Sequence, residues 1–289
     1  MRIDFHCHLF YEQMTPEFLK TQFKAFEGYS FFNRMLQGLE QLEPTKTDDP
    51  IKKTIIIAKR AQLDKIVLLS TSKNENERIK DWVKTKPDLF IPFFNPPEKS
   101  EDKMEVQKIV TKALIEEGFK GLKIMLPFRG KKINSENLFP AYEIANEQDF
   151  PVLFHTGYPP PGTPGKRMFM SLAKPVFLDS IAASFPSLKI IMAHMGYPWI
   201  DEAISMATQF PNMYLDISNL TYMQPNRMRD AILYAKDIIG LDKILFGSDG
   251  FCPEMIEVCV KAFLGVDYLK KDEINKIIGL NAKKLLNLK

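Results

Sequence analysis

Short apolar runs alternate with helical patterns along almost the whole chain. Eight of these runs have the length of buried strands, and they cover residues 2–8, 65–70, 89–94, 121–126, 152–155, 189–194, 213–217 and 243–249. They are nearly continuous in apolar residues, which is typical of strands in a parallel sheet covered by helices. The run at 89–94 is the weakest, because Pro92 has no N–H for the ladder of a central strand.

Segments of helical length lie between these runs, at residues 51–63, 74–86, 101–117, 137–148, 175–184, 198–209, 225–239 and 253–264. In the first of them, Ile55, Ile56, Ala58 and Ala61 are the expected inward positions. Eight strand–helix units favour a closed (β/α)₈ TIM barrel over an open sheet, and residues 272–287 predict one or two helices that close its outside. Because no linker or low-complexity segment interrupts the pattern, we expect residues 1–289 to form a single barrel domain.

Two segments depart from an even barrel. Residues 9–50 form a long, aromatic-rich insertion after the first strand, and we expect either a lid or helical padding there. Residues 158–168 are rich in Pro and Gly and closely follow the strand that ends at His155. The loops after barrel strands build the active site, so we expect this second segment over the barrel mouth.

Composition and charge narrow the function classes. The 289 residues are 45% apolar and carry a net charge of +3 without a basic tract, which argues against nucleic-acid binding. No segment reaches the roughly 18 apolar residues that span a membrane, and the first strand leaves no room for a signal peptide. Three cysteines, Cys7, Cys252 and Cys259, make no disulfide framework, so we expect a cytoplasmic protein.

The four histidines of the chain all stand at or near strand ends. His6 and His8 are two residues apart on the first strand, so their side chains share one face and can hold one ion. His155, His194 and Asp249 end the fifth, sixth and eighth strands. In a barrel these ends meet at one rim, and imidazoles with a carboxylate suit zinc, iron, manganese or cobalt.

This arrangement resembles the amidohydrolase superfamily over nearly the whole chain. The motifs that carry the resemblance are Asp4-Phe5-His6-Cys7-His8, Phe154-His155, Ala193-His194-Met195-Gly196, Phe246-Gly247-Ser248-Asp249 and the closing stretch 279–286. The best match is the amidohydrolase-related branch that includes aminocarboxymuconate semialdehyde decarboxylase and resorcylate decarboxylase. In single-metal members of that branch, the resemblance implies that His6, His8, His155 and Asp249 hold the ion. His194 would then activate water or polarise the substrate, and Asp249 would also shuttle a proton.

Lys123 leaves the number of metal ions open. It lies on the fourth strand, where two-metal members of the family carry a carboxylated lysine that bridges the ions. In that case His155 and His194 would hold the second ion. The alternatives are a cationic lysine that binds a substrate carboxylate, and a lysine without a role in the site.

Other candidates are less specific. Arg129, Tyr158 and Arg167 lie in loops that follow strands and are candidate substrate contacts, because a guanidinium pairs well with a carboxylate. Asp4 is expected on the face of His6 and His8, where it either orients a histidine or makes a structural hydrogen bond.

Three further residues are expected to be structural. Asp216 ends the seventh strand and is expected mainly to stabilise a turn. Cys7 is expected to pack away from the histidines. Cys252 is not expected to be a catalytic thiol, because no histidine remains to activate it.

The sequence therefore predicts a metal-dependent hydrolase, with one zinc ion and two as the alternative. Metal-activated water would cleave a C–N or C–O bond (amide, lactone or ester) of a small, carboxylated molecule. The main rival is nonoxidative decarboxylation of an aromatic or muconate-type acid in the same site. A metal-free lactonase and a non-catalytic binding barrel are weaker rivals. The resemblance also raises a homodimer, since related enzymes are often dimers.

Overall fold

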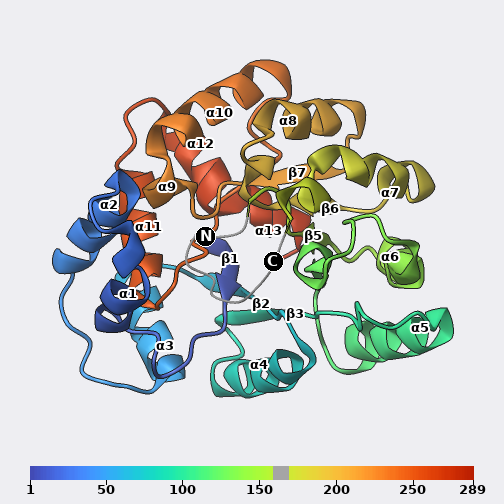
Figure 1. The fold of residues 1–289 in the computed structure, drawn as a ribbon, viewed down its shortest axis with the longest axis horizontal. Helices are drawn as coiled ribbons and strands as arrows, with labels where there is room; N and C mark the ends of the chain where they lie inside the picture. Colours follow the sequence, from blue (N-terminus) through green and yellow to red (C-terminus); the bar gives the residue numbers. More distant parts are fainter. Residues whose placement is uncertain (159–168) are drawn as a thin grey trace.

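The computed structural model describes residues 1–158 and 169–289, and within these ranges eight strands alternate with helices (Figure 1). The strands are β1 (Ile3–His8), β2 (Lys65–Leu69), β3 (Phe90–Phe93), β4 (Leu122–Ile124), β5 (Val152–Phe154), β6 (Ile190–Met192), β7 (Met213–Asp216) and β8 (Ile244–Leu245). Each strand lies inside a run that the sequence predicted, so the predicted strand order is confirmed.

Backbone hydrogen bonds join these strands into a closed barrel. Neighbouring strands pair in parallel and in sequence order within two groups, β1 to β3 and β4 to β8. A bridge between Phe94 and Leu122 joins the two groups on one side. On the other side the Phe5 amide donates to the Phe246 carbonyl at 2.8 Å, and the Asp249 amide donates to the His6 carbonyl at 2.8 Å. The first and last strands are therefore neighbours, as in a (β/α)₈ barrel.

Pro92 is tolerated in β3 because of where β4 begins. The Phe94 amide donates to the Gly121 carbonyl on the β4 side, and alternate residues of a strand direct their nitrogens to the same side. The Pro92 nitrogen thus also faces the β4 side, but β4 begins only at Leu122, further along the barrel axis. The missing N–H therefore removes no bond from the ladder.

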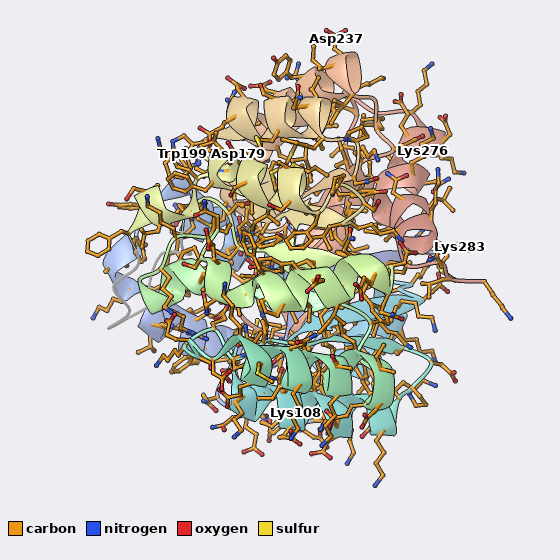
Figure 2. The ribbon with its side chains drawn as sticks, turned by 90° about the vertical axis from the view of Figure 1, so that its right-hand side faces the viewer. Lys108, Asp179, Trp199, Asp237, Lys276 and Lys283 are labelled. Atoms are coloured by element: carbon orange, nitrogen blue, oxygen red, sulfur yellow. The ribbon has the colours of Figure 1, made fainter. Side chains whose placement is uncertain are left out.

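The main helices cover the outside of the barrel (Figure 1), and charged side chains such as Lys108 and Asp237 project outward from them (Figure 2). They are α3 (Pro50–Arg60), α4 (Lys73–Thr85), α5 (Lys103–Thr111), α6 (Phe139–Glu147), α7 (Asp179–Ser184), α8 (Ile200–Gln209), α10 (Pro225–Ile238), α11 (Glu254–Leu264), α12 (Lys271–Asn275) and α13 (Asn281–Leu285). The expected inward face of α3 was wrong at Ile56, which is exposed, whereas Ile57 is buried. Three consecutive isoleucines, at 55–57, left it open which of them faces inward. The buried face of α3 is formed by Thr54, Ile57, Ala58 and Ala61.

A bulge in β1 corrects one expectation about the site. Phe5 packs inside the barrel, but Cys7, two residues on, packs in the layer outside it. A regular strand would place both on one face, and the register of β1 against β2 is indeed broken between Asp4 and Cys7. Asp4 therefore does not share the face of His6 and His8. Its carboxylate instead accepts from Ser248 N at 2.9 Å and Ser248 Oγ at 2.5 Å.

The insertion after β1 is helical. It contains α1 (Pro16–Gln22) and α2 (Ser30–Glu40), and α2 packs against α9 (Leu220–Met223) and α11 (Figure 1). The Arg34 guanidinium donates to the carbonyls of Tyr222 at 3.0 Å and Met223 at 2.7 Å. Phe23 packs against Phe251, in the loop after β8, with 4.7 Å between the ring centroids. The insertion is therefore fixed against the loops that follow β7 and β8, and its role as a lid stays a prediction.

Within the described part of the chain, every helix is too short or too polar to cross a membrane.

Candidate metal centre

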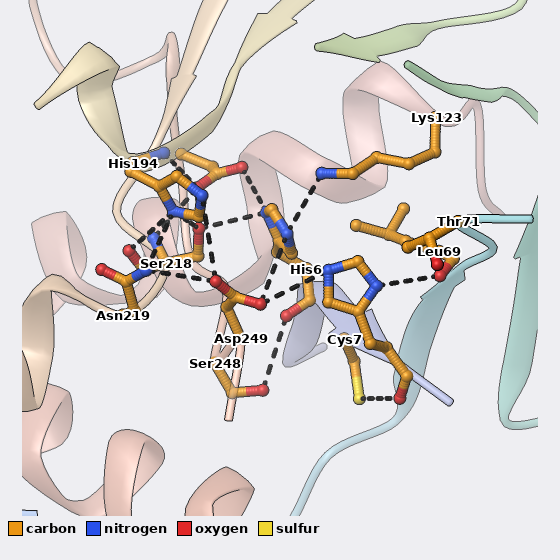
Figure 3. A network of polar contacts seen from close by, with 12 residues as sticks. His6, Cys7, Leu69, Thr71, Lys123, His194, Ser218, Asn219, Ser248 and Asp249 are labelled. Atoms are coloured by element: carbon orange, nitrogen blue, oxygen red, sulfur yellow. Dashed lines mark hydrogen bonds and ion pairs between the residues drawn. The ribbon is translucent and has the colours of Figure 1, made fainter. Parts of the chain in front are cut away.

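Side chains from several strands converge where the strands end (Figure 3). Asp249 lies at the middle of the group: its Oδ1 is 3.4 Å from His8 Nε2 and 3.7 Å from His6 Nε2, and its Oδ2 is 3.8 Å from His194 Nε2. His6, His8 and Asp249 offer ligand atoms that all lie within 4.8 Å of one another. The structure thus brings together residues that are far apart in the sequence.

His155 adjoins this group through His194. Its ring packs against Phe128 at 4.7 Å and His194 at 5.2 Å between centroids. Among the described residues, neither His155 Nε2 nor His194 Nε2 has a hydrogen-bond partner, although both atoms are buried. A buried polar atom without a partner is costly, so the two nitrogens are suited to bind a cation or a substrate.

The opposite nitrogens of three rings are hydrogen-bonded to oxygens. His6 Nδ1 is 2.8 Å from Asp216 Oδ2, His8 Nδ1 is 3.0 Å from the Leu69 carbonyl, and His194 Nδ1 is 3.3 Å from the Ser218 carbonyl. A carbonyl or carboxylate oxygen only accepts, so each Nδ1 carries the proton and each Nε2 keeps its lone pair. This is the arrangement by which proteins prepare histidines to bind metals.

The charges at the site also suit a divalent cation. Burial and the nearby Lys123 ammonium together lower the pKa of His6 to about 4, although Asp216 and Asp249 oppose the shift. Burial likewise lowers the pKa of His8 and holds the pKa of His155 well below its usual range. Burial alone would raise the pKa of Asp249, but His6, His194 and His8 outweigh it and lower that pKa to about 2. At neutral pH His6, His8 and His155 are therefore neutral imidazoles and Asp249 is a carboxylate, the protonation state that metal ligands need.

Lys123 reaches into the same space. Its Nζ is 3.3 Å from His6 Nε2, and its side chain is completely buried (Figure 3). Burial lowers the pKa of Lys123 to about 8, against the opposing effect of Asp249 and Asp216. The Lys123 side chain thus lies within the group of histidines. Both a carboxylated bridge between ions and a substrate contact stay predictions.

Several residues of the site have a strained backbone conformation. His194, Met195, Asn219 and Asp249, which follow β6, β7 and β8, have φ angles of 55°, 49°, 52° and 45°. Such left-handed conformations are costly for residues other than glycine and cluster at functional sites. Here the cost is offset by hydrogen bonds such as that from His194 N to Asp216 Oδ1 at 3.0 Å.

Two of the candidate substrate contacts are within the described residues. The Arg129 guanidinium lies at the mouth, donating to the Thr71 carbonyl at 2.5 Å with its Nε 3.2 Å from Glu98 Oε2. The Tyr158 ring packs against Tyr197 at 5.3 Å, and burial together with the nearby Asp249 charge raises the pKa of its hydroxyl. Arg167 lies outside the described residues.

Asp216, at the end of β7, and the residues that follow it contact the site more closely than their sequence indicated. Asp216 does stabilise a turn, since it accepts from Ser218 N at 3.0 Å, but it also contacts His6. Asn219 donates to Asp249 Oδ2 at 3.1 Å. The available signal was the alternation itself, which places Asp216 and Ser218 on one face at a strand end.

Cys7 and Cys252 are buried, and burial raises the pKa of both thiols far above the usual range.

A family model described as Amidohydrolase matches residues 3–288, so the chain belongs to the amidohydrolase family and is an enzyme. Among curated proteins, Protein fluG of Emericella nidulans is 27% identical over 145 residues. That match covers 47% of this chain but only 16% of fluG. The chain thus spans a small part of the length of this relative.

Several solved structures have the same fold. An uncharacterised TIM-barrel protein from Bordetella bronchiseptica has a TM-score of 0.73 and 21% identity, over 99% of this chain and 98% of that one. A provisionally named metal-dependent hydrolase from Lactobacillus casei has a TM-score of 0.76 and 18% identity, over 99% and 95%. The 5-carboxyvanillate decarboxylase of Novosphingobium aromaticivorans, solved with manganese and a nitrobenzoic acid, has a TM-score of 0.67 and 17% identity, over 100% and 96%. At these low sequence identities the similarity concerns the fold alone.

Proposed function

We propose that this enzyme is a metal-dependent hydrolase that cleaves a C–N or C–O bond of a small, carboxylated molecule. His6, His8, His155 and Asp249 would hold one divalent cation, for which zinc is the best match to imidazole and carboxylate ligands. A cation there would supply Lewis acidity and would lower the pKa of a bound water to about 7. The observation that carries the proposal is the set of imidazole Nε2 atoms that face the Asp249 carboxylate.

The remaining side chains fit the proton transfers of hydrolysis. His194 Nε2 is buried, has no partner among the described residues and lies 3.8 Å from Asp249 Oδ2. In this proposal Asp249 would receive the proton of the attacking water and pass it to the leaving group. His194 would polarise the substrate oxygen or take that water proton first. Tyr158 and Arg129 lie near the mouth, where Arg129 would pair with the substrate carboxylate. Arg167 is kept as a third candidate contact.

Lys123 decides between one and two cations. An ammonium 3.3 Å from His6 Nε2 repels a cation bound to that nitrogen. Carboxylation would turn Lys123 into an anionic ligand, and His155 and His194, whose rings are 5.2 Å apart, would then hold a second ion. Without carboxylation, Lys123 would bind the substrate carboxylate.

Nonoxidative decarboxylation is the second candidate function. It is supported by the similar fold of the manganese-containing 5-carboxyvanillate decarboxylase. In this chain it would use the same proposed ligands and would differ in the bond that breaks, so product analysis separates the two functions.

The test combines metal analysis with a substrate panel. Purified protein should contain about one equivalent of divalent metal per chain, or two if Lys123 is carboxylated. We expect it to hydrolyse members of a panel of carboxylated amides, lactones and esters, and chelation should abolish the activity. Release of carbon dioxide from aromatic or muconate acids, without hydrolysis, would replace this proposal by the second candidate. Full activity in metal-free protein would contradict both.

A further inference from the structure

Asp216, the last residue of β7, and Ser218, two residues further on, contact two histidines that come from different parts of the barrel. Asp216 Oδ2 is 2.8 Å from His6 Nδ1, and Asp216 Oδ1 accepts from His194 N at 3.0 Å. Ser218 Oγ lies 2.8 Å from His194 Nδ1 and 3.1 Å from His6 Nδ1. All four side chains are completely buried. A single carboxylate and a single hydroxyl therefore lie between a ring of β1 and a ring that follows β6.

The directions of these hydrogen bonds follow from the chemistry of each atom. Asp216 Oδ2 can only accept from His6 Nδ1, and the Ser218 hydroxyl donates to Asp216 Oδ1 in a very short contact. The lone pairs of Ser218 Oγ are then free to accept from His194 Nδ1, which also faces the Ser218 carbonyl. Asn219 Nδ2, at 3.4 Å from His194 Nδ1, is the most distant of these neighbours and also donates to Asp249. Both rings thus carry their proton on Nδ1.

We infer that Asp216 and Ser218 are positioning residues, which fix the tautomer and orientation of His6 and His194 together. Asp216 acts directly on His6, and Ser218 connects Asp216 to His194. Both rings therefore depend on the Asp216 carboxylate. The same group keeps the Nε2 lone pair free on His6, the proposed metal ligand, and on His194, the proposed proton-transfer residue. The part of this inference that concerns metal affinity rests on the proposed function, whereas the ring tautomers do not.

Asp216→Asn gives a sharp prediction, because the orientation of the new amide is fixed. Three donors face the position of Oδ1: His194 N, Ser218 N and Ser218 Oγ. The amide oxygen must therefore occupy that position, and its NH₂ group then faces His6 Nδ1. Two donors cannot pair, so His6 should change to the Nε2–H tautomer, in which Nε2 no longer has a free lone pair.

Ring nitrogen NMR of the metal-free protein tests the tautomers directly, and a chain with four histidines gives a simple spectrum. In the natural protein we expect Nδ1–H for His6 and His194. Asp216→Asn should convert His6, and Ser218→Ala should shift the signals of His194. His8 is an internal control, because its Nδ1 faces the Leu69 carbonyl and should keep its signals in both variants. An Nε2–H tautomer for His6 or His194 in the natural protein would overturn the inference.

Metal affinity gives the second readout, measured by competition between the protein and a chelator for Zn²⁺. We expect Asp216→Asn to weaken binding about 10–100-fold, as loss of a group that orients a metal-bound histidine does. Glu257→Gln is the matched control, because Glu257 is a buried carboxylate that pairs with Lys261 at 2.8 Å, away from the site. It should leave the affinity unchanged.

The outcomes separate this inference from the proposed function. A folded Asp216→Asn protein with unchanged Zn²⁺ affinity and an unchanged His6 tautomer contradicts the inference, whatever the enzyme catalyses. If Asp216→Asn does not fold, the NMR spectra of the natural protein and of Ser218→Ala decide alone. Failure of every hydrolysis assay with the expected tautomers would overturn only the proposed function.

Discussion

His8 differs from the other histidines of the centre in how it is held. Its side chain is 25% exposed, whereas those of His6 and His194 are 1% exposed, and its Nδ1 bonds to a backbone carbonyl of β2. The ring therefore contributes little to the core. Its Nε2 nevertheless lies closer to Asp249 than the corresponding atoms of His6 and His194 do.

His8→Ala should therefore abolish stoichiometric metal binding while the barrel stays folded. The stability of the metal-free variant should fall by only about 1 kcal/mol, the value of one hydrogen bond at a partly exposed site. Elemental analysis and chemical denaturation of the metal-free proteins measure the two effects. Retention of one equivalent of metal would show that the ligand assignment is wrong.

At the scale of the elements, a belt of polar contacts ties four loops of the barrel mouth together. We use the term mouth belt for Tyr11, Thr71, Glu75, Glu98 and Arg129. Glu75 accepts from the Tyr11 hydroxyl at 3.0 Å and the Thr71 hydroxyl at 2.7 Å, and Arg129 joins Thr71 to Glu98. Glu98 also accepts from the Met125 amide, after β4. The belt connects the loops after β1, β2, β3 and β4.

Glu98 makes this belt sensitive to pH. Burial raises the pKa of Glu98 from 4.5 to about 7, although the Met125 amide and Arg129 oppose the shift. Between these two pH values the folded protein binds more protons than the unfolded chain, so stability falls as pH rises from about 4.5 to 7. Glu98→Gln removes this dependence. We therefore expect the free energy of unfolding of Glu98→Gln, relative to that of the natural protein, to rise by about 1–3 kcal/mol between pH 5 and pH 8. Denaturation at the two pH values measures this difference.

Glu105→Gln is the control for this prediction, because Glu105 is exposed and accepts from Ser100 Oγ at 2.6 Å. It should not change the pH dependence. A natural protein and a Glu98→Gln variant whose stabilities change in parallel between pH 5 and pH 8 would contradict the assignment of a buried, easily protonated Glu98.

The same elements show what sequence reasoning could and could not predict. The strand runs, the helix ranges and the position of His6, His8 and Asp249 at one rim follow from periodicity and the rules of barrels. The bulge that turns Asp4 away from the histidines does not, because an extra residue in a strand is a matter of pairing with its neighbour. The partners of Asp216 also depend on which strands meet in space, and a residue-by-residue pattern carries no such information.

At the scale of the whole molecule, barrel closure brings β8 close to β1. A Cβ added at Gly247 would lie 2.5 Å from His6 Cβ and 3.0 Å from Ser218 Cβ. The absence of a side chain at Gly247 thus allows the last strand to approach the first one and the stretch after β7. The closure of the fold and the placement of His6 depend on the same contact.

Gly247→Ala should therefore destabilise the protein by about 1–3 kcal/mol through overpacking and also weaken metal binding, because His6 must move. Gly265→Ala is the control, since a Cβ there would make only ordinary contacts, the nearest at 3.4 Å, and its φ is −88°. It should change stability by no more than about 0.5 kcal/mol. Denaturation and a chelator competition on both variants measure this. A Gly247→Ala protein with natural stability would show that β8 can shift freely.

Closure between the first and last strands has a consequence for biosynthesis. Because synthesis runs from the N-terminus, His6 and His8 leave the ribosome well before Asp249 does. A cation that needs all of these groups stabilises only the finished cylinder, because binding favours the state that holds every ligand. Chains that end before Asp249 would gain nothing from the cation and would stay open to proteolysis, so a supply of the cation would select for chains that extend beyond Asp249.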